Sequence, residues 1–150
     1  MPGQFADLMR EFGVVAGLEN LAPDMNNECV LSIDAFLVSI CSRNDEELLL
    51  YAAVGKLPES NRELLMARLL AANYFFAETG GATLAVSPLN GEIQLIYSER
   101  LQGLDAQALT GILENFLARL EHWSMVCKAA NIPPTLAKSS VSSSLNLIRA

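Results

Sequence analysis

The chain has 150 residues, of which 51% are hydrophobic and 18% are charged, so it can bury one core of its own. Asp and Glu number 17 against 10 Lys and Arg, which gives a net charge of -7 at pH 7. An acidic surface repels phosphate backbones and anionic lipid headgroups. Nucleic acids and membranes are therefore not expected as partners.

Cys29, Cys41 and Cys127 are odd in number and widely spaced, which favours reduced, packed thiols over disulfides. The N-terminal residues show neither the basic nor the apolar region of a secretory signal. No run of about 18 apolar residues is present to span a membrane. These features predict a protein of a reducing cytoplasm.

The first elements along the chain are a helix and three strands. Apolar residues recur at helical spacing from Phe5 onward, and the helix is expected to end near Gly17. Residues alternate between two faces with a period of two, as in a strand, over residues 29–34 and again over 36–41. A tight connection at Asp34 and Ala35 joins the two strands. A third strand is predicted over residues 47–54. Three consecutive short strands indicate an antiparallel meander.

A second helix is predicted to begin at a capping box formed by Ser60 and Glu63 and to run over residues 64–79. Its body is apolar on more than one stripe, which one sheet face does not require, so part of it is expected to meet a second chain. Gly80 and Gly81 suit the left-handed conformation in which helices commonly end.

Two further strands are predicted over residues 82–86 and 92–98, joined by a hairpin turn at Asn90 and Gly91. Asp105 can cap a long helix, which Pro133 and Pro134 would end. Residues 1–134 then form one domain, and the Ser-rich residues 135–150 a tail that we expect to be mobile. The order α-β-β-β-α-β-β-α predicts an α+β fold with one mainly antiparallel sheet. The apolar positions of the long helix are Leu109, Ile112, Leu113, Phe116, Leu117, Leu120 and Trp123.

Residues that carry chemistry are scarce. His122 is the only histidine in the sequence, and a single imidazole cannot build a His-rich metal site. The acidic run at residues 45–47 lacks the pattern of a calcium loop, and no phosphate-binding glycine motif occurs. The fold could bring two distant carboxylates together for acid–base catalysis, and this alternative stays open. No sequence pattern favours such a pair. We therefore expect no catalytic residues, no metal and no cofactor.

Two stretches resemble the Tir-chaperone-like family, the class I chaperones of bacterial type III secretion. In residues 70–86 a helix ending in Asn73 and Tyr74 is followed by Thr79-Gly80-Gly81-Ala82 and a strand. The second stretch contains residues 91–97, Leu101-x-Gly103-Leu104-Asp105, Leu109, residues 113–116 and Glu121-His122-Trp123. The resemblance covers roughly residues 5–130 of the chain.

This resemblance implies a homodimeric, non-enzymatic chaperone of the bacterial cytoplasm. It would hold the N-terminal segment of a secreted effector, its client, in an extended form that stays soluble and competent for export. Such a segment can pair with a sheet edge while alternate side chains fill apolar pockets. The secretion ATPase and a regulator are further partners that the resemblance leaves open.

Site residues follow from the same resemblance. The expected dimer interface lies on the second helix and the following strand, at Leu69, Asn73, Phe76, Leu84 and Val86. The expected effector-binding residues lie on the first helix and early strands, at Phe5, Leu8, Phe12, Leu31, Ile33, Phe36 and Val38. Alternation lets only one face of each strand meet a client, and the sequence does not indicate which.

Two alternatives remain. In the first, the chain is a small dimeric α+β ligand-binding domain or enzyme whose apolar pocket takes a small molecule. Grouping of His122 with cysteines in one cavity would favour it. In the second, the same fold belongs to a regulator that sequesters a component of the secretion system.

Overall fold

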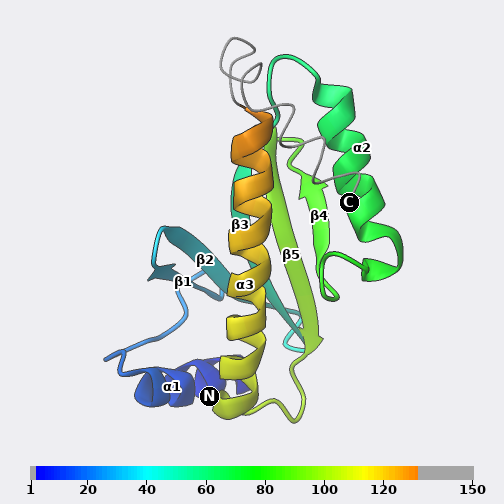
Figure 1. Ribbon diagram of the computed structural model, residues 1–150. Coiled ribbons are helices and arrows are strands. Elements are labelled where there is room, and N and C mark those ends of the chain that lie inside the picture. The colour runs from blue at the N-terminus through cyan, green and yellow to red at the C-terminus, as the bar shows by residue number, and fades with distance from the viewer. Residues whose placement is uncertain (1–2, 132–150) are drawn as a thin grey trace.

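A computed structural model describes residues 3–131 and shows an α+β fold in which helices pack on an antiparallel sheet (Figure 1). The predicted order of elements is confirmed, with a short 3-10 helix added after the second helix. The predicted helix end at Pro133 and Pro134, the domain boundary at residue 134 and the tail 135–150 lie outside the described residues. The elements are α1 (Gln4–Ala16), β1 (Glu28–Ile33), β2 (Phe36–Arg43), β3 (Glu47–Lys56), α2 (Arg62–Asn73), η1 (Tyr74–Phe76), β4 (Thr83–Val86), β5 (Glu92–Arg100) and α3 (Ala106–Ala130).

Over residues 3–131 the strands form one sheet in the order β1-β2-β3-β5-β4, and each neighbouring pair is antiparallel. The predicted meander and hairpin are therefore confirmed. Asp34 takes a φ of 53° in the turn between β1 and β2, a left-handed conformation that Asp tolerates better than most residues. In the β4–β5 turn the positive φ of 74° falls on Gly91.

One face of the sheet carries the core. Leu31, Val38 and Ile40 are buried on this face, whereas Val30 and Leu37 on the other face are exposed, as the period-two pattern predicts. α3 runs along the core face, and α1 packs against the N-terminal part of α3 (Figure 1). The sheet is therefore covered on one side by helices. None of the helices within residues 3–131 is long and apolar enough to cross a membrane.

The predicted cap of α3 is confirmed, because the Asp105 side chain accepts a hydrogen bond from the Ala108 N–H at 2.7 Å. Near the other end of this helix, the fully buried Trp123 donates from Nε1 to the carbonyl of Glu78 at 3.1 Å. Arg68 of α2 lies 5.0 Å from the Trp123 ring and pairs with the Glu78 carboxylate at 2.6 Å. These contacts tie the segment after α2 to α3.

The second helix begins where the sequence predicts, at Arg62, but its predicted cap and its predicted end were wrong. Asn61 precedes α2 with a φ of 59° and no side-chain capping bond, so Ser60 and Glu63 do not form a capping box. The helix ends at Asn73 and not at Thr79. Phe75 takes a φ of 52°, which breaks the helical path before Gly80 and Gly81. The helical spacing continues in the sequence, but tertiary contacts of this segment override it.

Asn73 also closes one edge of the sheet. Its side-chain amide donates to the carbonyl of Leu84 at 2.9 Å and accepts from the Leu84 N–H at 2.8 Å. The Asn73 side chain therefore stands where a neighbouring strand would pair with the edge strand β4.

Asn73→Ala is expected to lower the free energy of unfolding by about 1–3 kcal/mol, because both backbone groups of Leu84 lose their partner. Denaturant unfolding measures the loss. Asn115→Ala is the matched control, since Asn115 is exposed on α3 and changes there usually cost less than about 0.5 kcal/mol. Equal stabilities of the two variants would contradict this role of Asn73.

Candidate functional site

The other edge of the sheet is β1, which pairs with β2 and has no strand on its outer side among residues 3–131. Residues of an antiparallel strand point their backbone groups alternately toward the partner and away from it. Ser42 N–H bonds the carbonyl of Asn27 at 3.3 Å, which sets this alternation in the β1–β2 register. It follows that Val30 and Ser32 direct their N–H and C=O groups outward. We refer to these two residues as the open edge.

Glu28 is the next residue of β1 whose backbone faces outward, but its groups are already paired. The N–H of Asp24 donates to the Glu28 carbonyl at 2.9 Å. The Glu28 N–H donates to Asp24 Oδ1 at 3.1 Å. The segment before β1 therefore covers this end of the strand, and the open edge stops at Val30.

A groove of about 850 Å³ runs beside the open edge, between the end of α1, the connection to β1, and α3. We call it the α1–β1 groove. One helical stripe of α3 forms its wall, at Thr110, Leu113, Glu114 and Leu117. Most of the remaining lining is apolar. The apolar lining residues from α1, the connection and β1 are Phe12, Val15, Ala16, Leu18, Leu21, Ala22, Cys29, Val30, Leu31 and Ile33.

Among residues 3–131, the charged residues that line this groove are all acidic: Glu19, Asp24, Glu28 and Glu114. Glu28 accepts a hydrogen bond from the Tyr51 hydroxyl at 2.7 Å, which holds its carboxylate on the outer sheet face. Burial, together with the charges of Asp24 and Glu28, raises the pKa of the Cys29 thiol to about 11. Cys29 is therefore uncharged at neutral pH and serves the groove as an apolar side chain.

The residues predicted to bind an effector lie in this part of the molecule, but most are core residues of the chain itself. The structure brings three of them to the groove, and of these Ile33 is half-buried whereas Phe12 and Leu31 are buried. Phe36 is half-buried on β2. Their assignment to an effector surface stays a prediction. The remaining residues, which do not line the groove, are buried: Phe5, Leu8 and Val38.

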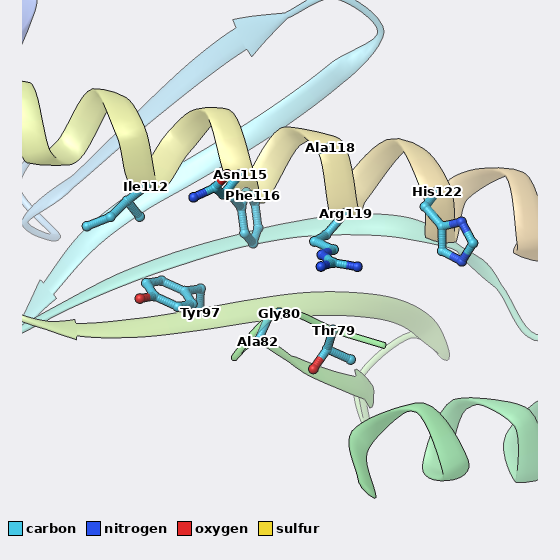
Figure 2. Close-up of a pocket in the computed structure, with 10 residues that line it drawn as sticks. All are labelled: Thr79, Gly80, Ala82, Tyr97, Ile112, Asn115, Phe116, Ala118, Arg119 and His122. Atoms are coloured by element: carbon cyan, nitrogen blue, oxygen red, sulfur yellow. The ribbon is translucent and has the colours of Figure 1, made fainter. Parts of the chain in front are cut away.

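A second pocket, of about 490 Å³, lies between α3, β5 and the segment before β4 (Figure 2). Arg119 and His122 extend from α3 toward Thr79 and Gly80, while Tyr97 comes from β5 (Figure 2). No cysteine lines this pocket. His122 is exposed, as predicted for a helix-surface residue. The grouping of His122 with thiols that would favour a ligand-binding enzyme is therefore not found in the described part of the chain.

The thiols themselves are packed. Cys127 is buried with a pKa raised to about 11 by its burial, and Cys41 is half-buried with a pKa raised mainly for the same reason. A protonated thiol is a poor nucleophile. Within residues 3–131 no group of three or more His, Cys, Asp or Glu residues is placed to hold a metal ion.

An exposed apolar face remains on α2. Its inner face is buried at Leu65, Leu69 and Ala72. Leu70 and Tyr74 on the outer side are 70% and 72% exposed. A helix that is apolar on both faces is normally buried on both. We call the outer stripe the α2 patch; it consists of Leu64, Ala67, Leu70, Ala71 and Tyr74.

The predicted dimer residues lie beside this patch, and only some of them reach the surface. Leu69 and Leu84 are buried within the chain, and Asn73 is bonded to Leu84. Phe76 and Val86 are 52% and 36% exposed. Their assignment to an interface stays a prediction.

Comparison with known proteins gives one family. The family model described as "Tir chaperone protein (CesT) family" matches residues 7–124. The Tir chaperone of Escherichia coli O157:H7 is 32% identical over 75 residues, which are 49% of this chain and 47% of that protein. The match thus spans about half the length of that relative. The Tir chaperone of Citrobacter freundii is 25% identical over 120 residues, or 79% of this chain and 76% of that protein.

Solved structures share the fold. The ExsC–ExsE complex contains a chain with a TM-score of 0.70 and 22% identity, covering 81% of this chain and 92% of that chain. The HopA1–SchA chaperone–effector complex gives a TM-score of 0.68 and 18% identity, covering 81% and 94%. These likenesses bear out the α+β architecture that the sequence predicts.

Proposed function

Because this chain belongs to the Tir chaperone protein (CesT) family, we propose that it is a homodimeric chaperone of bacterial type III secretion. It binds the N-terminal segment of a secreted effector in extended form and keeps that segment soluble and competent for export. It acts in the bacterial cytoplasm without catalysing a reaction. The similar fold in the HopA1–SchA chaperone–effector complex supports an effector as the partner.

The observation that carries the proposal is the open edge beside the α1–β1 groove. An extended peptide can pair with the free backbone groups of Val30 and Ser32. The side chains of a paired strand alternate between faces. Those opposite Leu31 and Ile33 therefore point toward the groove, where apolar side chains lose contact with water. Backbone pairing accepts clients of different sequence, because every residue carries the same backbone groups. The groove adds a preference for clients with apolar side chains at alternate positions.

The acidic lining adds charge selection. Glu19, Asp24 and Glu114 stand around an apolar groove that carries no Lys or Arg among the described residues that line it. Basic residues of a client next to its apolar side chains are therefore favoured, and acidic ones are repelled. The net charge of -7 also keeps a chain with exposed apolar surface in solution.

The α2 patch supports the dimer. Isologous pairing of two copies about a two-fold axis would place Leu70 and Tyr74 of each copy against the partner and remove both from water. The β4 edge, which Asn73 closes, lies beside this patch, so dimerisation leaves the β1 edge of each copy free for a client (Figure 1).

Co-expression in a type III-secreting bacterium tests the proposal. The tagged chain is purified, the mass of the complex is measured by light scattering, and captured chains are identified. We expect a dimer carrying one effector, whose capture is lost when the N-terminal segment of that effector is deleted. A dimer that carries only a small molecule would contradict the proposal, and capture of a regulator would favour sequestration.

Val30→Pro tests the backbone pairing in the same experiment. Proline removes the outward N–H of Val30 but no bond to β2, and proline is tolerated on edge strands. We expect client affinity to fall about tenfold, because a client carbonyl loses its donor. Val30→Ala keeps the N–H and is the control. Equal affinity of the two variants would exclude strand pairing at this position.

A further inference from the structure

Asp24 holds an unusual place at the end of the open edge. It occupies, with both its backbone and its side chain, the position of a neighbouring strand opposite Glu28. The carbonyl of Glu28 accepts from the Asp24 N–H at 2.9 Å, and Asp24 Oδ1 accepts from the Glu28 N–H at 3.1 Å. The same Oδ1 accepts from the Asn26 N–H at 2.8 Å, and the Asp24 carbonyl accepts from the Asn27 N–H at 3.0 Å. One residue thus both folds the turn before β1 and covers the edge of that strand.

The arrangement limits how a strand can add to β1. Toward the end of β1 the edge is terminated by the turn at Asp34 and Ala35. Toward its start, an added strand would meet Asp24. Between these limits only Val30 and Ser32 present outward backbone groups, so an added strand has one place on β1 at which to pair. Without Asp24, a strand could shift by two residues and pair with Glu28 and Val30, with the same sheet faces and similar bonds.

We propose that Asp24 is a register stop that confines an added client strand to Val30 and Ser32 of β1 and so fixes where its alternate side chains meet the α1–β1 groove. This inference rests on the proposed strand addition at β1. The stop places one client side chain opposite Leu31 and the next alternate one opposite Ile33, and it prevents a shift toward Cys29. The carboxylates of Asp24 and Glu19 line that end of the groove, where the client residues run past the stop. The client chemistry is therefore an apolar pair at alternate positions, with a basic residue just beyond the Asp24 end.

Amide hydrogen exchange measured by NMR tests the stop on the full chain. The probe is a short synthetic peptide in which Val alternates with Ser and two lysines stand at each end, so that lysine reaches Asp24 whichever way the added strand runs. In the free protein we expect slow exchange at Glu28 and fast exchange at Val30 and Ser32. The peptide should slow exchange at Val30 and Ser32 and leave Glu28 unchanged. Asp24→Ala loses the side-chain bonds to the Glu28 and Asn26 N–H groups, so the turn no longer holds the residue-24 backbone against the Glu28 carbonyl. In this variant Glu28 should exchange about tenfold faster in the free chain and become protected when the peptide is added.

Asp24→Asn is the matched variant, because its side-chain oxygen can still accept from the Glu28 N–H. It should keep the wild-type pattern of protection and weaken only the preference for lysine. A purely structural role in the turn would also speed exchange in Asp24→Ala, but it would not let the peptide protect Glu28. Absence of that protection, or fast exchange of Glu28 in the free wild type, would overturn the register stop. Absence of protection at Val30 and Ser32 would instead overturn strand addition itself.

Discussion

Leu70→Glu is expected to convert the dimer into folded monomers. Leu70 is 70% exposed within the chain, so a carboxylate at this position is solvated in the monomer and does not disturb the core. In the proposed dimer both copies lose a buried leucine, at about 1.5–3 kcal/mol each. The sum of about 3–6 kcal/mol corresponds to a dissociation constant roughly 10²- to 10⁴-fold higher.

Light scattering over a concentration series measures this shift, and circular dichroism checks that the variant is folded. Leu37→Glu is the control, because Leu37 is an equally large, exposed side chain at the distant β1–β2 turn. A Leu70→Glu variant that stays dimeric at low concentration would place the interface elsewhere. Leu84→Asp is a weaker test, since Leu84 is buried in the core and its replacement would unfold the chain itself.

The fold could be predicted because its signals are local. Alternation at Cys29, Leu31 and Ile33 determines the core face of β1, and the apolar period from Leu109 to Trp123 determines α3. The end of α2 could not be predicted. Its helical pattern runs on past Asn73, and the helix stops because the Asn73 side chain is bonded to β4 and Trp123 binds the backbone of Glu78. Both contacts join separate elements of the fold, and the second links residues 45 positions apart in the sequence.

The candidate site, like the fold, could be predicted from the sequence only in part. Sequence pattern places apolar residues on α1 and β1, but it does not show that the chain itself buries Phe12 and Leu31 or that the outward backbone groups of Val30 lack a neighbouring strand. That distinction needs the strand order, because only the order shows that β1 is an edge. The α2 patch is different. Its members follow helical spacing, so the stripe could have been found from the sequence once the inner face was known.

Leu117→Glu is expected to abolish client capture while leaving the dimer intact. Leu117 lies on the α3 wall of the α1–β1 groove and is half-buried in the free chain. A glutamate there remains hydrated until a client covers the groove. Binding would then bury a carboxylate among apolar side chains and forfeit the contact that Leu117 provides, at a combined cost of about 3 kcal/mol or more. Affinity should fall at least about 100-fold.

Met125→Glu makes the same kind of change on the same helix, at a residue that is exposed and does not line the groove. Co-purification of the effector with the two variants, each checked for dimer mass, separates loss of the groove from loss of the fold. Retention of the effector by Leu117→Glu would move the client to another surface. Loss of the effector in Leu117→Glu but not in Met125→Glu would place the bound segment against α3 beside the open edge. One client would then pair with β1 and fill the α1–β1 groove at the same time.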